Sequence, residues 1–176
     1  MRDIFSFDRR VLVCGALAAA VGARAHQLRP WTATRAPPLS LSDLDGKTWE
    51  LTALEGRAVL LNFWATWCEP CREEMPSLEV LAKRHRADPM VVLTVNYQES
   101  ESGIRRFLER VPLGLPVLLD RDGSATKAWT PRVFPTTVLI DRSGHPRHQV
   151  VGAVDWAGAE ARQWVAELLA SGGQRS

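Results

Sequence analysis

Apolar residues occur along the chain in blocks whose periods predict strands and helices in turn. Residues 58–65 and 90–97 are short, nearly continuous apolar runs, typical of strands buried on both faces. Residues 70–86 and 100–110 follow them with apolar positions at helical spacing, although Pro76 should kink the first helix. A strand, a helix and a second strand in this order need a parallel crossover connection.

The second half of the chain predicts a third parallel unit and then a hairpin. A strand at 116–120 leads into a short helix that ends at Trp129. Strands at 136–140 and around 149–154 flank a Ser-Gly turn, and 156–169 forms a last amphipathic helix. The order β-α-β-α-β-α-β-β-α predicts a mixed sheet with helices on both faces.

Two segments precede the first buried strand. Residues 39–42 and 48–51 alternate apolar and polar side chains around Asp45-Gly46, a pattern that predicts an edge β-hairpin. The stretch from 26 to 38 holds three prolines and no clear period. We therefore expect a flexible arm over 26–37 and the folded domain over 38–172.

The first 25 residues have the three parts of a secretory signal. A basic start precedes an apolar run over 11–21, and Ala23-Arg24-Ala25 supplies small residues where signal peptidase cuts, so cleavage after Ala25 is expected. The run is shorter than the roughly 20 residues of a spanning helix. The paired Arg9-Arg10 suits a twin-arginine signal, and the general secretory route stays open. Either route places the mature chain in the periplasm, outside the reducing cytosol.

Composition and charge narrow the class of protein. The 176 residues are 45% hydrophobic and 24% charged, which fits one globular domain. Lys and Arg number 22 against 20 acidic residues, and loss of 1–25 removes four basic and two acidic side chains, leaving a formally neutral chain. Nucleic-acid binding is therefore not expected. Of three cysteines, Cys14 lies in the signal without the small preceding residue of a lipoprotein site, so Cys68 and Cys71 remain.

The pair Cys68 and Cys71 lies where the first buried strand gives way to a helix. The N–H groups and dipole of a helix N-terminus stabilise a thiolate, so the pKa of the Cys68 thiol should be lowered. Cys71, three residues later, returns to the same face inside the first turn, where it is better shielded. Pro70 suits the first helical position, where its missing N–H costs nothing. This spacing favours an exposed attacking thiol and a protected resolving one.

The spacing of the cysteines leaves two other roles to consider, a zinc site and a structural disulfide. His145 and His148 form an H-x-x-H pair that would complete a Cys2His2 zinc site, but they lie far beyond the spacing of a zinc finger. A purely structural disulfide would close so tight a loop that its entropic stabilisation is small. Redox chemistry is therefore favoured, and it needs no metal or cofactor.

Two motifs give the chain a family resemblance. Residues 62–76 read N-F-W-A-T-W-C-E-P-C-R-E-E-M-P and residues 133–141 read V-F-P-T-T-V-L-I-D. They resemble the active-site segment and the cis-proline loop of extracytoplasmic thioredoxin-like proteins of the TlpA, ResA and CcmG type. The resemblance covers about 38–169. It implies an α/β thioredoxin-like fold, with a mixed central sheet, helices on both faces and an added N-terminal β-hairpin.

The resemblance also implies roles for single residues. Glu74 matches the acidic residue beneath the disulfide, and its spacing from Cys71 independently puts it on the cysteine face; if buried, it would exchange protons with Cys71, whereas a solvated Glu74 would not. Pro135 matches the cis-proline, unless its bond is trans. Glu99 matches a second acidic residue, or is a solvated loop side chain. The expected substrate contacts are Trp67, Glu69, Pro70 and Phe134, and Trp64 is also expected to line the site.

The expected reaction is thiol-disulfide exchange on a disulfide-bearing protein. Glu69 opposes the Cys68 thiolate, which favours a reductant kept reduced by a membrane thiol-disulfide electron donor. The resemblance suggests apocytochrome c, in cytochrome c maturation, as client. Two alternatives stay open: a peroxiredoxin-type peroxidase, which places threonine three residues before its cysteine where this chain has it at two, and a metal or haem delivery module.

Overall fold

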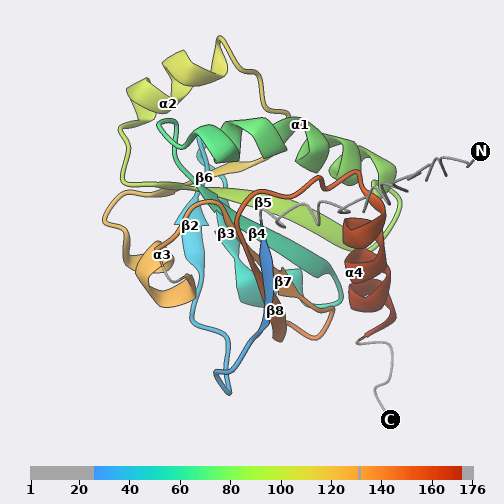
Figure 1. Cartoon of the computed structure of the whole chain (residues 1–176). Coiled ribbons are helices and arrows are strands. Elements are labelled where there is room, and N and C mark those ends of the chain that lie inside the picture. The colour runs from blue at the N-terminus through green and yellow to red at the C-terminus, as the bar shows by residue number, and fades with distance from the viewer. Residues whose placement is uncertain (1–25, 131, 172–176) are drawn as a thin grey trace, which may run out of the picture.

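A six-stranded mixed sheet forms the centre of the computed structural model, which describes residues 26–130 and 132–171 (Figure 1). The proposed signal, with Cys14, lies outside the described residues. The strand order is β1-β8-β7-β4-β5-β6, with β4, β5 and β6 parallel and the other pairings antiparallel. The strands are β1 (Gln27–Pro30), β4 (Ala58–Trp64), β5 (Met90–Tyr97), β6 (Val117–Asp120), β7 (Thr136–Ile140) and β8 (Pro146–Val151).

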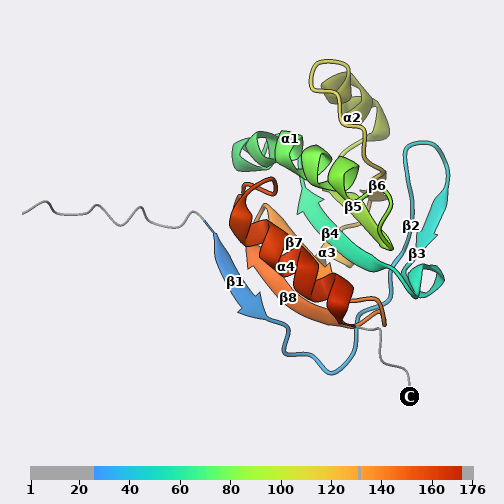
Figure 2. The same ribbon diagram turned by 90° about the vertical axis from the view of Figure 1, so that its right-hand side faces the viewer.

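Helices cover both faces of this sheet, as the sequence predicts (Figures 1 and 2). One face carries α1 (Glu69–Arg84), α2 (Glu101–Leu108) and α4 (Ala159–Ala170). The other carries α3 (Ser124–Trp129), the short 3-10 helix η1 (Leu51–Leu54) and the hairpin of β2 (Ser40–Ser42) and β3 (Thr48–Glu50). No helix within the described residues is long and apolar enough to cross a membrane.

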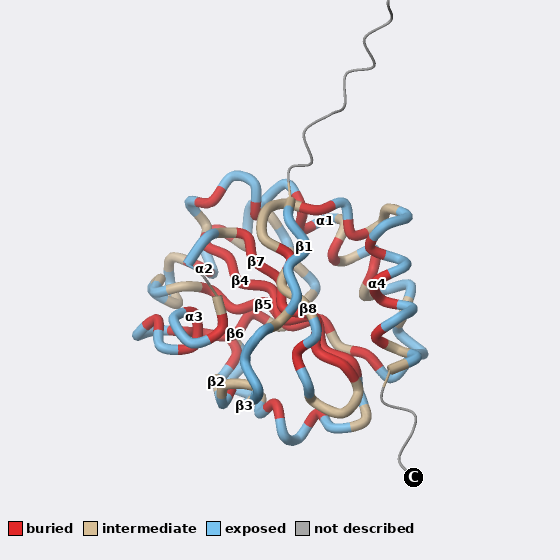
Figure 3. The backbone as a smooth tube through the Cα atoms, turned by 60° about the horizontal axis from the view of Figure 1, so that its bottom comes forward, coloured by how far each residue is buried: buried red, intermediate tan, exposed pale blue. Residues whose placement is uncertain are grey.

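Strand β4 is the centre of the core because all seven of its residues are buried (Figure 3). Side chains alternate along a strand, so Leu60 packs toward α1 and α4, whereas Leu61 packs toward α3. This two-sided burial explains the continuous apolar run, and it holds the carboxyl end of β4 rigidly at the start of α1.

The prediction of a flexible arm over 26–37 is wrong for residues 27–30. Gln27–Pro30 forms β1 and pairs antiparallel with β8, from Gln27 opposite Val151 to Pro30 opposite His148. All four side chains are exposed, so the strand buries neither face and leaves no alternating pattern. Backbone pairing, which hydrophobic periodicity does not report, creates this element.

The last strand and helix are displaced from their predicted places. The turn that Asp141 caps ends at His145, so β8 starts to pair with β7 at Pro146. β8 ends at Val151, and Gly152, with a φ of +99°, follows it. Residues 152–154, predicted to end the strand, and 156–158, predicted to begin the helix, instead lie in a loop. The hairpin β2–β3 is confirmed, but it is a separate two-stranded sheet joined to β6 by one bridge, Asp43 to Leu118.

Candidate active site

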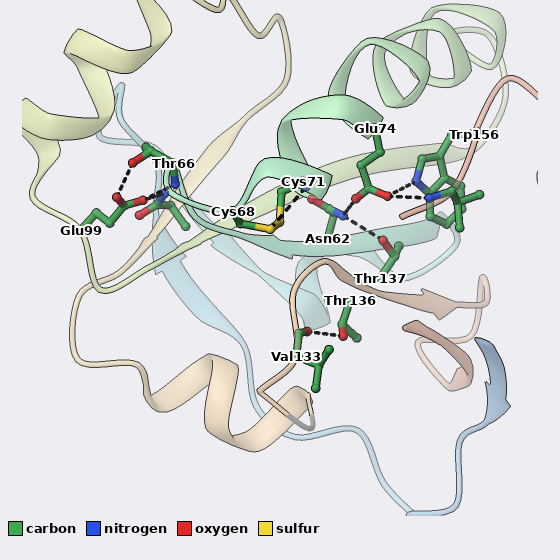
Figure 4. The surroundings of a disulfide bond; sticks show 12 residues. Asn62, Thr66, Cys68, Cys71, Glu74, Glu99, Val133, Thr136, Thr137 and Trp156 are labelled. Carbon is green, nitrogen blue, oxygen red and sulfur yellow. Dashed lines mark hydrogen bonds between the residues drawn. A yellow bond between two sulfur atoms is a disulfide. The ribbon is translucent and has the colours of Figure 1, made fainter. Parts of the chain in front are cut away.

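Cys68 and Cys71 are joined by a disulfide at the point where β4 ends and α1 begins (Figure 4). Cys68 is the N-cap of α1 in extended backbone conformation, and its Sγ accepts a hydrogen bond of 3.3 Å from the backbone N–H of Cys71. Pro70 occupies the first turn. Cys68 is 5% exposed and Cys71 1%, so Cys68 is the more accessible sulfur, although both are buried in this oxidised form. The helix N-terminus is where a thiolate is best stabilised.

Glu74 lies one turn further along α1, on the same helix face as Cys71 (Figure 4). Its carboxyl is buried, with 3% of the residue exposed. Burial raises the pKa of Glu74 to about 7, and hydrogen bonds from Val154, Asn62 and Trp156 only partly oppose this rise. The solvated alternative is therefore wrong, and Glu74 can carry or release a proton at neutral pH.

Three donors, one from β4 and two from the loop after β8, hold this carboxyl. Nδ2 of Asn62, in β4, donates to Oε1 of Glu74 over 2.7 Å and to Oγ1 of Thr137 over 2.9 Å. Oε2 accepts from the backbone N–H of Val154 at 3.1 Å and from Nε1 of Trp156 at 3.2 Å. Asn62 and Thr137 are register partners across β4 and β7, so the sheet fixes one side of the site.

Glu99 is tied to the loop that carries the cysteines. Its carboxylate accepts hydrogen bonds from the backbone N–H of Thr66 at 2.7 Å, from Oγ1 of Thr66 at 2.5 Å and from Nδ2 of Asn96 at 2.7 Å. Glu99 is therefore not simply a solvated loop residue. It fixes the backbone two residues before Cys68 and does not contact the sulfur.

The loop before β7 lies next to the disulfide, on the side away from α1 (Figure 4). The bond between Phe134 and Pro135 is cis, as the resemblance implies, and Pro135 is buried. Phe134 packs against the cluster that contains both cysteines, and its ring meets that of Trp67 edge to face at 5.8 Å. The loop thus places an aromatic side chain beside the reactive pair, and the cis-proline follows it directly in the chain.

Among the remaining predicted contacts, the structure separates exposed from buried residues. Trp67 is 65% exposed, and Glu69 and Pro70 are exposed beside it. Trp64 instead is fully buried, where it packs against Phe107. Trp64 therefore packs in the core beneath the site and does not line its surface. The Glu69 carboxylate has a cation nearby, Nη2 of Arg72 at 3.7 Å, in an exposed pair that is worth little.

The zinc alternative fails on geometry. His145 lies just ahead of β8, and His148 lies within it. His148 pairs with Leu139 of β7, which pairs on its other side with Leu60, near the start of β4. The cysteines follow the opposite, carboxyl end of β4. In the described part of the chain, no group of three or more His, Cys, Asp or Glu side chains is arranged to hold a metal ion.

Sequence reasoning missed Asn62 and Trp156, which both bind Glu74. Asn62 carries a usable signal, because a polar side chain within a continuous buried run needs a hydrogen-bonding partner. Trp156 carries none, since only the path of the loop after β8 brings it to α1.

A thioredoxin-like sheet with a C-x-x-C disulfide at the start of its first long helix defines a thiol-disulfide oxidoreductase. The family model described as "AhpC/TSA family" matches residues 32–149. The thiol-disulfide oxidoreductase ResA of Geobacillus thermodenitrificans is 37% identical over 119 residues, 68% of each chain. The thioredoxin-like protein YneN of Bacillus subtilis is 41% identical over 113 residues, 62% of this chain and 65% of YneN.

Solved structures agree with this assignment. The crystal structure of a putative thiol:disulfide interchange protein DsbE from Chlorobium tepidum has 30% sequence identity and a TM-score of 0.71, over 77% of this chain and 95% of that one. The chain belongs to the AhpC/TSA family, among the thiol-disulfide oxidoreductases of the ResA type.

Proposed function

We propose that this oxidoreductase works as a reductase of protein disulfides outside the cytoplasm. The observation that carries the proposal is the buried Glu74 on the face of Cys71, with its pKa raised to about 7. A protected resolving thiol needs a base to become a thiolate, and a carboxyl poised near neutral pH supplies one.

The reaction has two exchanges. The Cys68 thiolate attacks one sulfur of the client disulfide, that bond breaks, and the other client sulfur leaves as a thiolate. Cys71 then gives its proton to the Glu74 carboxylate and attacks Sγ of Cys68, which releases the second client sulfur. Two electrons pass to the client, and the protein is left with the disulfide seen in the structure.

The charge beside the attacking sulfur supports the direction. Glu69 follows Cys68 directly and is exposed, and its negative charge disfavours the thiolate form of the reduced protein. A less stable reduced form gives electrons more readily. In an oxidising compartment such a protein needs a membrane thiol-disulfide donor to return it to the dithiol.

The proposed surroundings follow from the sequence. A signal over residues 1–25 would export a chain whose folded domain begins with the strand β1 rather than at residue 38. Apocytochrome c is the client that the family resemblance suggests, because its haem-binding cysteines must be reduced before haem is attached. In this proposal Trp67, Pro70 and Phe134 contact the client, and the backbone just before Pro135 pairs with it.

The direction is tested by the reduction potential of the Cys68–Cys71 pair, measured against glutathione buffers. We expect a potential below about −200 mV, whereas a strong oxidant would lie near −120 mV and would contradict the proposal. Insulin reduction by the wild-type protein, with Cys68→Ser and Glu74→Gln as comparisons, tests turnover. A Cys71→Ser variant retains the mixed disulfide, so its covalent adducts identify the client.

The peroxidase alternative is less supported. Thr66 lies two residues before Cys68 rather than three, and its hydroxyl donates to Glu99. Peroxide consumption by Cys71→Ser protein would revive this alternative. A delivery module would bind metal or haem stoichiometrically and leave insulin unreduced.

A further inference from the structure

Three aromatic side chains from separate segments form a row beside Cys68. Trp67 belongs to the loop between β4 and α1, Phe134 to the loop before β7, and Tyr97 is the last residue of β5. The ring centroids of Trp67 and Phe134 are 5.8 Å apart, and those of Phe134 and Tyr97 are 5.3 Å apart. We call these three residues the aromatic row. Its far member, Tyr97, is not among the residues predicted to touch a substrate.

The row faces solvent next to the reactive sulfur. Trp67 is 65% exposed, Val133 beside Phe134 is 48% exposed, and Phe134 and Tyr97 are partly exposed. Two of the four exposed large apolar residues in the described part of the chain therefore adjoin this site. Exposed apolar side chains that adjoin one another mark a surface that another molecule covers.

Tyr97 is held in place by the turn between β6 and α3. Gln98 has a positive φ of 52°, its backbone N–H donates to the carbonyl of Asp120 over 3.0 Å, and its Nε2 donates to the carbonyl of Asp122 over 2.9 Å. Gly123 leaves room for the ring, since a Cβ there would lie 2.8 Å from Cε2 of Tyr97. A side chain fixed before binding loses little entropy when it is covered, which suits an anchor for a ligand.

We propose that the aromatic row selects the client, and that Tyr97 contacts a large apolar side chain two residues away from the client's reactive cysteine. The occupant is the disulfide-bearing segment itself, because its sulfur must reach Cys68 and the row continues directly from there. Residues i and i+2 of an extended segment lie on one side, about 7 Å apart, so a client side chain two residues from the reacting cysteine is on the same side of the client backbone as the sulfur. This inference rests on the proposed function and adds a specificity to it.

The test uses short peptides with one cysteine, activated as the mixed disulfide with thionitrobenzoate. Cys68 attacks the peptide sulfur and releases thionitrobenzoate as a coloured thiolate. Cys71 then attacks Cys68 and releases the peptide as a free thiol, which leaves the protein as the Cys68–Cys71 disulfide. One peptide series carries Phe two residues before or after the cysteine, a second carries Phe next to it, and a third carries only Ser. We expect one of the peptides with Phe two residues from the cysteine to react about tenfold faster than the Ser peptide. The peptide with Phe next to the cysteine should show no such gain.

Tyr97→Ala should reduce the ratio of Phe-peptide to Ser-peptide rates to below about threefold, whereas Tyr97→Phe retains it. Val80→Ala, which removes exposed apolar surface in the middle of α1, is the matched control and keeps the ratio. A Tyr97→Ala protein that slows both peptides equally, or keeps their ratio, overturns the inference. A wild-type protein without preference does so too, whereas failure of the wild type to react with any disulfide overturns the proposed function.

Discussion

Nε1 of Trp156 donates a hydrogen bond to Oε2 of Glu74 over 3.2 Å, although the two residues are 82 positions apart. Val154 donates its backbone N–H to the same oxygen, so the loop after β8 supplies two of the donors that face this buried carboxyl. The protonation of Glu74 is therefore coupled to the packing of that loop on α1.

The free energy of unfolding of the oxidised protein should fall as pH rises from about 4.5 to about 7. The pKa of Glu74 is raised from 4.5 to about 7 in the folded state, so in this interval the folded protein binds the proton that the unfolded chain has lost. The loss amounts to about 3 kcal/mol, and it is complete above pH 7. Denaturant unfolding at a series of pH values measures it.

Glu74→Gln should abolish this pH dependence, because glutamine does not titrate. Its absolute stability also falls, because glutamine has one acceptor oxygen where the carboxylate has two, so either Asn62 or the pair of Val154 and Trp156 loses its acceptor. The matched variant is Glu73→Gln at the exposed neighbouring position, which should retain the wild-type profile. Equal pH profiles for wild type and Glu74→Gln would show that Glu74 does not titrate in this range.

Trp156→Phe should raise the pKa of Glu74 further. The indole N–H stabilises the charged carboxylate, and a hydrogen bond to a charged group is worth enough to move the midpoint by about one pH unit. NMR titration of ¹³C-labelled glutamate carboxyl groups follows the midpoint directly. Trp164→Phe is the control, because Trp164 packs edge to face on Trp156, and no hydrogen bond joins it to Glu74. A downward or absent shift in Trp156→Phe contradicts the assignment.

Glu99→Gln should loosen the loop before Cys68. The amide keeps the length of the side chain but carries no charge, so it weakens the charge-assisted hydrogen bonds from Thr66 and Asn96, at a cost of about 1–3 kcal/mol. Faster hydrogen exchange at the Thr66 amide and slower reduction of a small disulfide are expected together. Glu109→Gln, at the exposed end of α2, should change neither. The idea fails if both variants behave alike.

Substitution of two glycines separates backbone strain from a steric clash. Gly123 and Gly46 both have positive φ, +74° and +83°, so alanine costs about 1–2 kcal/mol at either position. Only at Gly123 would the new Cβ meet the Tyr97 ring; at Gly46 it meets nothing within 4 Å. Gly123→Ala should therefore destabilise the protein more than Gly46→Ala, as thermal unfolding would show. Equal losses would mean that the ring moves freely.

The sequence predicts those parts of the fold that depend on local pattern. The buried runs became β4 and β5, and the spacing of Glu74 from Cys71 places it on the cysteine face, because three residues make almost one helical turn. β1 was missed because its side chains are exposed and only its backbone pairs.

The missing parts of the site depend on contacts between distant segments. Asn62 and Trp156 reach Glu74 from a neighbouring strand and from a loop, and neither contact leaves a periodic trace. Tyr97 joins the aromatic row through its neighbour Phe134, 37 positions away along the chain. Register and loop path decide these contacts, and neither can be read from the spacing of residue types.

The register of β1 has a practical consequence for any device that carries this protein on a solid support. Gln27 pairs with Val151, Val151 with Thr136, and Thr136 with Phe63, so β1 starts at the end of the sheet where Cys68 lies. Helix α4 ends at the other side, where Ser171 shares a groove with Arg147 at the start of β8. A protein immobilised just ahead of β1 turns its dithiol toward the support, whereas attachment after α4 leaves the dithiol facing the bulk solution.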